Sequence, residues 1–281
     1  MSTSPLSAAP SPSPASLSGR TVLVTGATTG IGYQTARQLA QRGATVLVHG
    51  RTPEDARAAV STLRSGPDGI QGERLCAFSA DFTRFEEVEL LAHRVRTEHP
   101  HLDVLVNNAA MAAPERHTVT DDGNEVTFQV NFLAHYLLTC LLEEALTSEP
   151  GGRVVNVSSS LHRTASIQWD DPNRARRYSR IASYAQSQLA LTVFAADPRV
   201  TAVSVHPGVC DTALLPLYAH RGSTPAQGAA HVARLCDPAT EIVNGAYYEC
   251  DRCVEPAQGA TAARMVKRLT KLADTLVAPA A

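Results

Sequence analysis

Three glycines, Gly26, Gly30 and Gly32, occupy a turn between an apolar β-branched run at residues 21–25 and a helical pattern at residues 33–42. A strand that turns sharply into a helix leaves backbone N–H groups unpaired at the positive end of the helix dipole, so this turn predicts an anion site. A Walker-type triphosphate loop would need a lysine after its last glycine, and none follows here. The sequence therefore predicts a bound dinucleotide, although glycines in a loop can also be simple turn residues.

The expected second strand, residues 44–48, is followed by Arg51, about where the ribose of a dinucleotide is bound. An acidic residue there would bind the ribose diol of NAD, and no Asp or Glu occurs between Gly43 and Pro53. A guanidinium pairs with a phosphate through two hydrogen bonds, so Arg51 predicts NADP(H) as the cofactor. The alternative for Arg51 is a solvated surface arginine.

Polar residues also follow the next two strands. Asp81, with Phe82 beside it, comes directly after the third strand. Its carboxylate could accept a hydrogen bond from an adenine amino group, cap the helix expected at residues 84–97, or do both. After the fourth strand, Asn108 is expected to tie neighbouring backbones together, and the small Ala109 to leave room for the ribose.

Strand and helix patterns alternate along the chain without repeats, which predicts a doubly wound parallel sheet. We expect one α/β domain of Rossmann type over residues 19–281, with a mostly seven-stranded parallel sheet. Such sheets bind ligands beyond the carboxyl ends of their strands, where the residues above fall. One long helix is expected within residues 123–147, and Asn131 inside it is a residue type that helix interiors disfavour.

The composition is that of an ordinary soluble enzyme, with net charge −2, 19% charged and 44% hydrophobic residues. We expect no nucleic-acid partner without a basic excess, and no membrane partner because no apolar run approaches the roughly 18 residues of a membrane helix. Residues 1–18, rich in Ser, Pro and Ala, predict a disordered tail rather than a secretory signal. Six cysteines in 281 residues form no disulfide framework, which favours a reducing cytoplasm. No metal site is expected, because Cys250 and Cys253 lack a second pair of ligands nearby.

From Thr21 to about Pro256 the chain resembles the short-chain dehydrogenase/reductase family. The resemblance rests on motifs in the family's order and approximate spacing, namely Thr25-Gly26, Asn107-Asn108-Ala109, Asn131, Val157-Ser158-Ser159, Tyr184 and Pro207-Gly208. Within the family it is most similar to the retinol-dehydrogenase-like branch, through Asn131-Phe132-Leu133-Ala134-His135, Ser159-x-x-His162, Arg177-Tyr178-Ser179 and Gly245-Ala246-Tyr247-Tyr248.

The resemblance implies a carbonyl reductase or alcohol dehydrogenase that acts on a small molecule with a nicotinamide cofactor. Ser159, which lies 25 residues before Tyr184 as in this branch, would hold the substrate oxygen. Tyr184 would pass a proton to or from that oxygen, and Asn131 would anchor a water in the proton relay. The residues expected to bind the cofactor are Gly26, Thr28, Thr29, Gly30, Ile31, Arg51, Asp81, Phe82, Asn108, Ala109, Tyr184, Gln188, Pro207, Gly208, Val209 and Thr212.

Gln188 departs from the family, which places a lysine four residues after the tyrosine. That lysine binds the nicotinamide ribose and lowers the pKa of the tyrosine, and a glutamine can do only the first. A phenol with an ordinary pKa of about 10 stays protonated at neutral pH, so it can serve as an acid in reduction and is a poor base in oxidation. His162 and Arg163 are the nearest candidates for a replacement cation. We expect a reductase with Gln188 as an atypical catalytic residue.

Two further departures concern the elements around Tyr184. The helix that carries it is shorter than in the family, where it usually packs against a neighbouring subunit, so we expect a monomer or a homodimer built through another face. The cover at residues 212–225 is also short, which predicts an open site for a bulky substrate or one poorly sealed from water. Two alternatives remain open: a lyase, isomerase or cyclase that uses Ser159 and Tyr184, and a silent binding protein.

Overall fold

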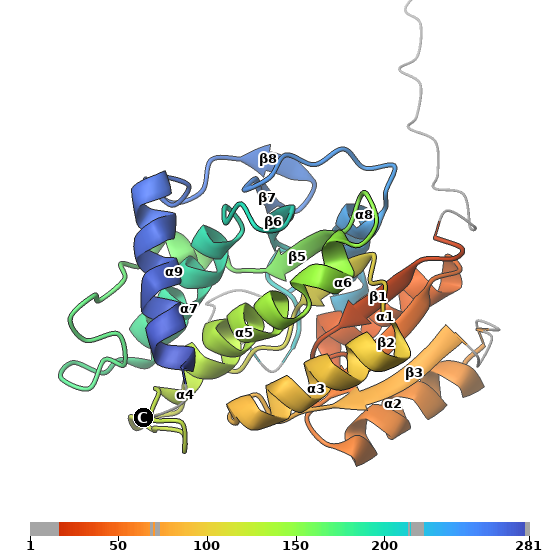
Figure 1. Cartoon of the computed structure of the whole chain (residues 1–281), viewed down its shortest axis with the longest axis horizontal. Coiled ribbons are helices and arrows are strands. Elements are labelled where there is room, and N and C mark those ends of the chain that lie inside the picture. Colours follow the sequence, from red (N-terminus) through yellow and green to blue (C-terminus); the bar gives the residue numbers. More distant parts are fainter. Residues whose placement is uncertain (1–16, 68–69, 71–73, 213, 215–221, 279–281) are drawn as a thin grey trace, which may run out of the picture.

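A single mixed sheet forms the centre of the molecule (Figure 1). The computed structural model describes residues 17–67, 70, 74–212, 214 and 222–278. Within these residues eight strands pair in the order β3-β2-β1-β4-β5-β6-β7-β8, parallel except that β8 runs antiparallel to β7. The strands are β1 (Thr21–Val24), β2 (Thr45–Gly50), β3 (Leu75–Ser79), β4 (Val104–Asn107), β5 (Arg153–Val157), β6 (Ala202–His206), β7 (Tyr247–Glu249) and β8 (Arg252–Val254). The expected α/β doubly wound fold is confirmed, and the three-residue β8 was too short to be predicted.

Helices cover both faces of the sheet (Figure 1). One apolar core joins the sheet to α1, α2 and α8, and a second joins its other face to α3, α5 and α7. The helices are α1 (Gly30–Gln41), α2 (Pro53–Ser65), α3 (Phe85–Glu98), α4 (Val126–Phe128), α5 (Ala134–Leu141), α6 (Glu143–Thr147), α7 (Arg180–Phe194), α8 (Pro225–Cys236) and α9 (Ala263–Val277). Consecutive residues of β1 point to opposite cores, Leu23 to one and Val22 and Val24 to the other, as expected of a strand buried on both faces.

The long helix expected within residues 123–147 is present but is not a regular α-helix throughout, so that prediction is wrong in detail. A π-helical segment, Gln129–Leu133, separates α4 from α5, and a further break separates α5 from α6. Asn131 lies inside the π-helical segment. π-bulges are frequent at functional sites, and this one accounts for an asparagine where a regular helix would disfavour it.

Helix α7 is buried on every side, from Ser183 to Phe194. Its outer side is covered by α9, which crosses it in Figure 1 and contacts it directly. Polar contacts attach α9 to the rest of the fold. The Tyr136 hydroxyl of α5 donates to the Asp274 carboxylate, and the Thr270 hydroxyl donates to Asp197 over 3.1 Å. The protein's own C-terminal helix therefore occupies the outward face of α7.

The ordered fold begins earlier than the sequence indicates. Leu17 is fully buried, and its N–H donates to the carbonyl oxygen of Arg42 over 3.1 Å. The predicted tail of residues 1–18 is therefore wrong for its last two residues, because one leucine among small polar residues gives little local signal. Residues 1–16 lie outside the described residues.

Candidate active site

A cavity of ≈ 370 Å³ opens at the carboxyl ends of the parallel strands. This volume is within the usual range for small-molecule sites. The residues predicted to bind the cofactor that line it are Gly26, Thr28, Thr29, Gly30, Ile31, Arg51, Asp81, Phe82, Asn108, Ala109, Tyr184, Pro207, Gly208 and Thr212. Val209 is not among the lining residues; its carbonyl oxygen accepts hydrogen bonds from the N–H and hydroxyl of Ser223. Most of the predicted cover, residues 213 and 215–221, lies outside the described residues.

The first turn of α1 faces this cavity and fits a pyrophosphate. Thr29 is its N-cap residue and makes no side-chain capping bond, and the first turn holds no acidic residue. Gly26 and Gly30 have φ of 59° and 58°, in the left-handed region that favours glycine. A Cβ atom at Gly26 would lie 2.8 Å from the Cα of Ala109. Uncapped N–H groups at the positive helix end suit a bound phosphate.

Thr25 and Asn108 join the glycine turn to the end of β4. The Thr25 hydroxyl accepts hydrogen bonds from the N–H groups of Asn108 and Ala109, at 2.8 and 2.9 Å. In return, the Asn108 side chain donates to the carbonyl oxygens of Thr25 and Gly26, at 2.8 and 3.2 Å. The structure therefore shows Asn108 linking two backbones as the sequence predicted.

His49, at the end of β2, supports the same turn and was not predicted from the sequence. Its Nδ1 accepts a hydrogen bond from the Gly26 N–H over 3.1 Å, and Nε2 lies 3.1 Å from the carbonyl oxygen of Ala80. The ring stacks on Phe82 with 4.7 Å between centroids. Burial lowers the pKa of His49 to about 4, so the ring stays neutral and holds the turn in place. A histidine within an otherwise apolar strand was the available signal.

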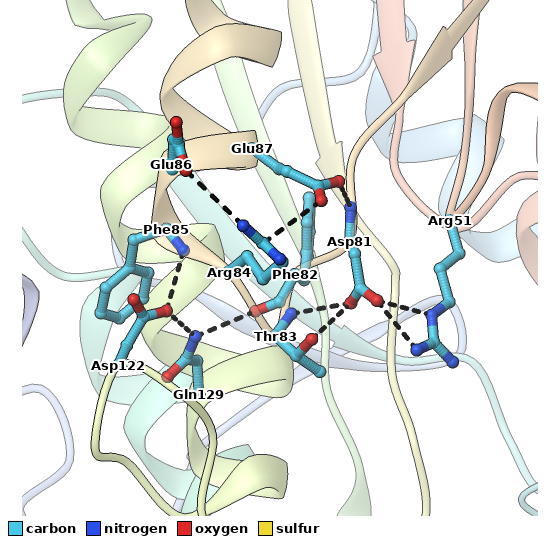
Figure 2. Close-up of polar contacts among 10 residues, drawn as sticks. All are labelled: Arg51, Asp81, Phe82, Thr83, Arg84, Phe85, Glu86, Glu87, Asp122 and Gln129. Atoms are coloured by element: carbon cyan, nitrogen blue, oxygen red, sulfur yellow. Dashed lines mark hydrogen bonds and ion pairs between the residues drawn. The ribbon is translucent and has the colours of Figure 1, made fainter.

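Arg51 and Asp81 form an ion pair at the rim of the cavity (Figure 2). Nε and Nη2 of Arg51 each lie 2.8 Å from Oδ2 of Asp81. The other carboxylate oxygen accepts from the N–H and hydroxyl of Thr83. Partial burial opposes ionisation of Asp81, but these hydrogen bonds more than offset it and hold its pKa below the ordinary value. The Arg51 side chain remains 72% exposed, so a ligand can reach the guanidinium.

Asp81 does not cap α3, the alternative that the sequence left open for it. The Phe85 N–H at the start of α3 donates instead to Asp122 over 2.9 Å, and Gln129 donates to the same carboxylate oxygen over 2.6 Å (Figure 2). The Asp81 N–H donates to Glu87 of the first turn. Asp122 lies 37 residues beyond Phe85 along the chain, so no local pattern could assign the cap.

Of the three consecutive serines Ser158, Ser159 and Ser160, only Ser158 lines the cavity. Its hydroxyl lies 2.7 Å from the Thr192 hydroxyl and 3.3 Å from the carbonyl oxygen of Gln188, so it is engaged with α7. Ser159 is 1% exposed, and its hydroxyl accepts from the Leu161 N–H over 3.1 Å. The predicted catalytic serine is thus next in sequence to a lining residue and is the N-cap of a short 3-10 helix, Ser160–Thr164.

Asn131 is committed to contacts within the protein. Its side-chain oxygen accepts from the Met111 N–H over 2.9 Å, and its amide nitrogen donates to the Met111 carbonyl and to the Ser187 hydroxyl, each over 3.1 Å. Its own carbonyl oxygen lies 3.1 Å from Nδ1 of His135. Asn131 therefore ties the segment after β4 to α7, and its role with a relay water stays a prediction.

Gln188 is 1% exposed, and its Oε1 has no hydrogen-bond partner among the described residues. It does not line the cavity. The two candidates for a replacement cation are not available. Arg163 pairs with Glu249 at 3.1 Å, and burial lowers the pKa of His162, which leaves its ring neutral.

The lining residues that were not predicted include Met111, Val130, His206 and Cys210. Met111 and Val130 contribute apolar side chains to the lining of the cavity. Burial lowers the pKa of His206 to about 4, so this ring is neutral in the cavity. His206 immediately precedes Pro207, and that position was the available signal.

Two kinds of feature are absent from the part of the chain that the structure describes. None of its helices is both long and apolar enough to span a bilayer. No group of three or more His, Cys, Asp or Glu side chains in it is arranged to hold a metal ion.

Comparison with known proteins places the chain in a family. A model described as short chain dehydrogenase matches residues 20–220. Mouse retinol dehydrogenase 13 is 38% identical over 214 residues, 72% of this chain and 62% of its own length, so the chain matches less than two thirds of that relative. A Streptomyces protein named “Putative daunorubicin C-13 ketoreductase DnrU” is 37% identical over 270 residues, 88% of each chain.

A solved structure agrees with these matches. A protein from Mycobacterium paratuberculosis superposes with a TM-score of 0.75 at 29% identity, covering 92% of this chain and 94% of that chain. The fold, the glycine turn and the strand-end residues found here are consistent with these similarities. The chain belongs to the short-chain dehydrogenase/reductase family of oxidoreductases and is similar to its retinol-dehydrogenase-like members.

Proposed function

We propose that the protein is an NADP(H)-dependent reductase of a ketone or aldehyde. The observation that carries this proposal is that Tyr184 lines the same cavity as the uncapped N-terminus of α1. A proton donor and an anion-binding helix end then share one site. The name of the Streptomyces relative includes ketoreductase, which supports the reductive direction.

Each residue has a defined task in this proposal. When bound, NADPH supplies a hydride to the carbonyl carbon. The Tyr184 hydroxyl donates the proton that the oxygen then needs, and the Ser159 hydroxyl donates a hydrogen bond to that oxygen as charge develops on it. Gln188 lies one helical turn after Tyr184, and its buried amide oxygen, which has no partner among the described residues, would accept a hydrogen bond from a ribose hydroxyl that reaches it. Met111 and Val130 favour an apolar, bulky substrate.

Purified protein mixed with NADPH and a panel of aldehydes and ketones tests the function. Loss of the reduced nicotinamide absorbance with at least one bulky apolar carbonyl is the expected result. If NADPH binds but no carbonyl is reduced, a lyase, isomerase or cyclase reaction becomes the better proposal. If NADPH does not bind, the protein is not an enzyme of this type.

Arg51→Ala is expected to abolish a preference for NADPH over NADH. The exposed guanidinium at the cavity rim would pair with the 2′-phosphate, and a charge-assisted hydrogen bond of this kind contributes about 1.5–3 kcal/mol. Competition from Asp81 reduces the gain, so we expect about a tenfold loss of NADPH affinity and little change for NADH. Titration of both cofactors by fluorescence measures the difference.

Arg57→Ala is the matched control, because Arg57 pairs with Glu54 on the next helix and does not line this cavity. It removes the same charge from the same region. Equal affinity of the unaltered protein for the two cofactors would contradict the assignment of Arg51.

We also propose a monomer, or a homodimer built through another face, in the cytoplasm and without nucleic-acid or membrane partners. The contact of α9 with α7 supports the monomer or the homodimer built through another face, because the family usually packs the helix equivalent to α7 against a neighbouring subunit. Light scattering is expected to give the mass of one chain or two. A tetramer would contradict the proposal.

A further inference from the structure

A buried histidine lies behind the expected catalytic serine. His162 belongs to the 3-10 helix that follows Ser159, and it is 0% exposed. Its ring Nδ1 lies 2.8 Å from the main-chain oxygen of Ser159. The backbone N–H of His162 donates to the same oxygen over 3.1 Å. One residue therefore holds the Ser159 peptide group through two hydrogen bonds.

The hydrogen bonds determine which ring nitrogen carries the proton. The Ala257 N–H donates to Nε2 of His162 over 3.0 Å. A peptide N–H can only donate and a carbonyl oxygen can only accept, so Nδ1 is protonated and Nε2 is not. Burial lowers the pKa of His162 and outweighs the opposite effect of the Ser159 carbonyl, which keeps the ring neutral. Both nitrogens are occupied, so the ring is not available as a proton relay.

The same ring connects Ser159 to a distant part of the chain. Ala257 is 95 residues from His162 and lies between β8 and α9. The ring also packs against Tyr247 of β7, with 4.5 Å between centroids. Arg163, the next residue, is paired with Glu249 of the same strand. The short helix that begins at the serine is therefore attached to the far edge of the sheet.

We propose that His162 is a positioning residue that orients Ser159 toward the substrate oxygen. This inference rests on the proposed function, in which Ser159 holds that oxygen. The Ser159 hydroxyl accepts from the Leu161 N–H, so the hydroxyl and the carbonyl of the serine are both attached to the 3-10 helix. Because a misplacement of about 1 Å at a reacting group can cost about a hundredfold in rate, loss of this attachment affects turnover.

Two substitutions separate the contact of the His162 side chain with Ser159 from its contact with Ala257. His162→Asn places an amide N–H near the position of Nδ1 and keeps the bond to Ser159. His162→Gln places its amide near the position of Nε2 and keeps only the contact with Ala257. We expect kcat for reduction of the carbonyl substrate to fall about tenfold or more in the His162→Gln variant. In the His162→Asn variant it should fall less than about threefold. NADPH affinity should be unchanged in both. His93→Gln, on the exposed side of α3, controls for the substitution itself.

Ser159→Ala in each background then distinguishes the two proposals. If His162 acts through the serine, His162→Gln has no further effect on kcat once Ser159 is alanine. Additive losses would overturn the positioning role while leaving the proposed function intact. Undiminished kcat in Ser159→Ala alone would instead overturn the role of Ser159 in the proposed function.

A measurement without substrate tests the same geometry. In protein with ¹⁵N-labelled histidine, the His162 ring should show the proton on Nδ1 at neutral pH, exchanging slowly with water. The resonance is assigned by its absence in His162→Asn. A ring protonated mainly on Nε2, or on both nitrogens, would overturn the inference.

Discussion

Tyr184→Phe is expected to remove nearly all turnover while cofactor binding stays intact. The substitution deletes only the hydroxyl, and the ring that remains still fills its site, where Tyr184 is 3% exposed. General acid catalysis by a positioned side chain typically contributes about 10²–10⁴-fold, so kcat should fall by this amount. The measurement is kcat for the best carbonyl of the panel, together with the dissociation constant for NADPH.

Tyr178→Phe is the matched control for Tyr184→Phe. It also deletes one phenolic hydroxyl, which bonds to the Pro114 carbonyl oxygen, and Tyr178 does not line the cavity. We expect a change in kcat of less than about threefold for this variant, because the Tyr178 hydroxyl takes no part in the proton transfer to the substrate. Undiminished activity in Tyr184→Phe would exclude Tyr184 as the proton donor.

Gln188→Lys is expected to turn the protein into a better alcohol dehydrogenase. A cation one helical turn after Tyr184 favours the phenolate and so makes a better base. Each unit by which a pKa falls corresponds to about 1.4 kcal/mol, so a fall of two units would raise the fraction of Tyr184 in the phenolate form at neutral pH about a hundredfold, and oxidation should rise with it. The basic limb of the pH–rate profile should move to lower pH by the same amount. Initial rates in both directions against pH measure the effect.

The environment of Gln188 makes a second variant necessary. The side chain is buried, and a lysine there pays for its desolvation. Gln188→Met keeps the approximate volume without a charge, so it should leave the pH profile in place. If the unaltered protein already oxidises alcohols well at neutral pH and the lysine changes nothing, another group activates Tyr184. If the lysine variant gains no redox activity in either direction, non-redox chemistry is favoured.

The positions of the strands along the chain and the glycine turn were predictable because their signals are local. A short β-branched run such as Thr21–Val24 is typical of a strand buried on both faces, and Gly26 and Gly30 adopt backbone angles that favour glycine. The residues that follow parallel strands must meet at one edge of the sheet. That rule predicted that Asp81 and Asn108 lie at one site, and both line the cavity.

Contacts between distant segments were decided only by the tertiary structure. The pairing of Arg51 with Asp81 spans 30 residues, and the contact of His162 with Ala257 spans 95. Neither contact produces a periodic pattern of residues in the sequence. Each depends on how the fold brings two distant segments together, and not on the spacing of residues within one segment. The π-helical segment around Asn131 also depends on distant contacts. The Asn131 side chain forms hydrogen bonds with Met111 and Ser187, which belong to other segments of the chain. Local propensity determines which elements form, whereas packing determines which polar groups face one another across them.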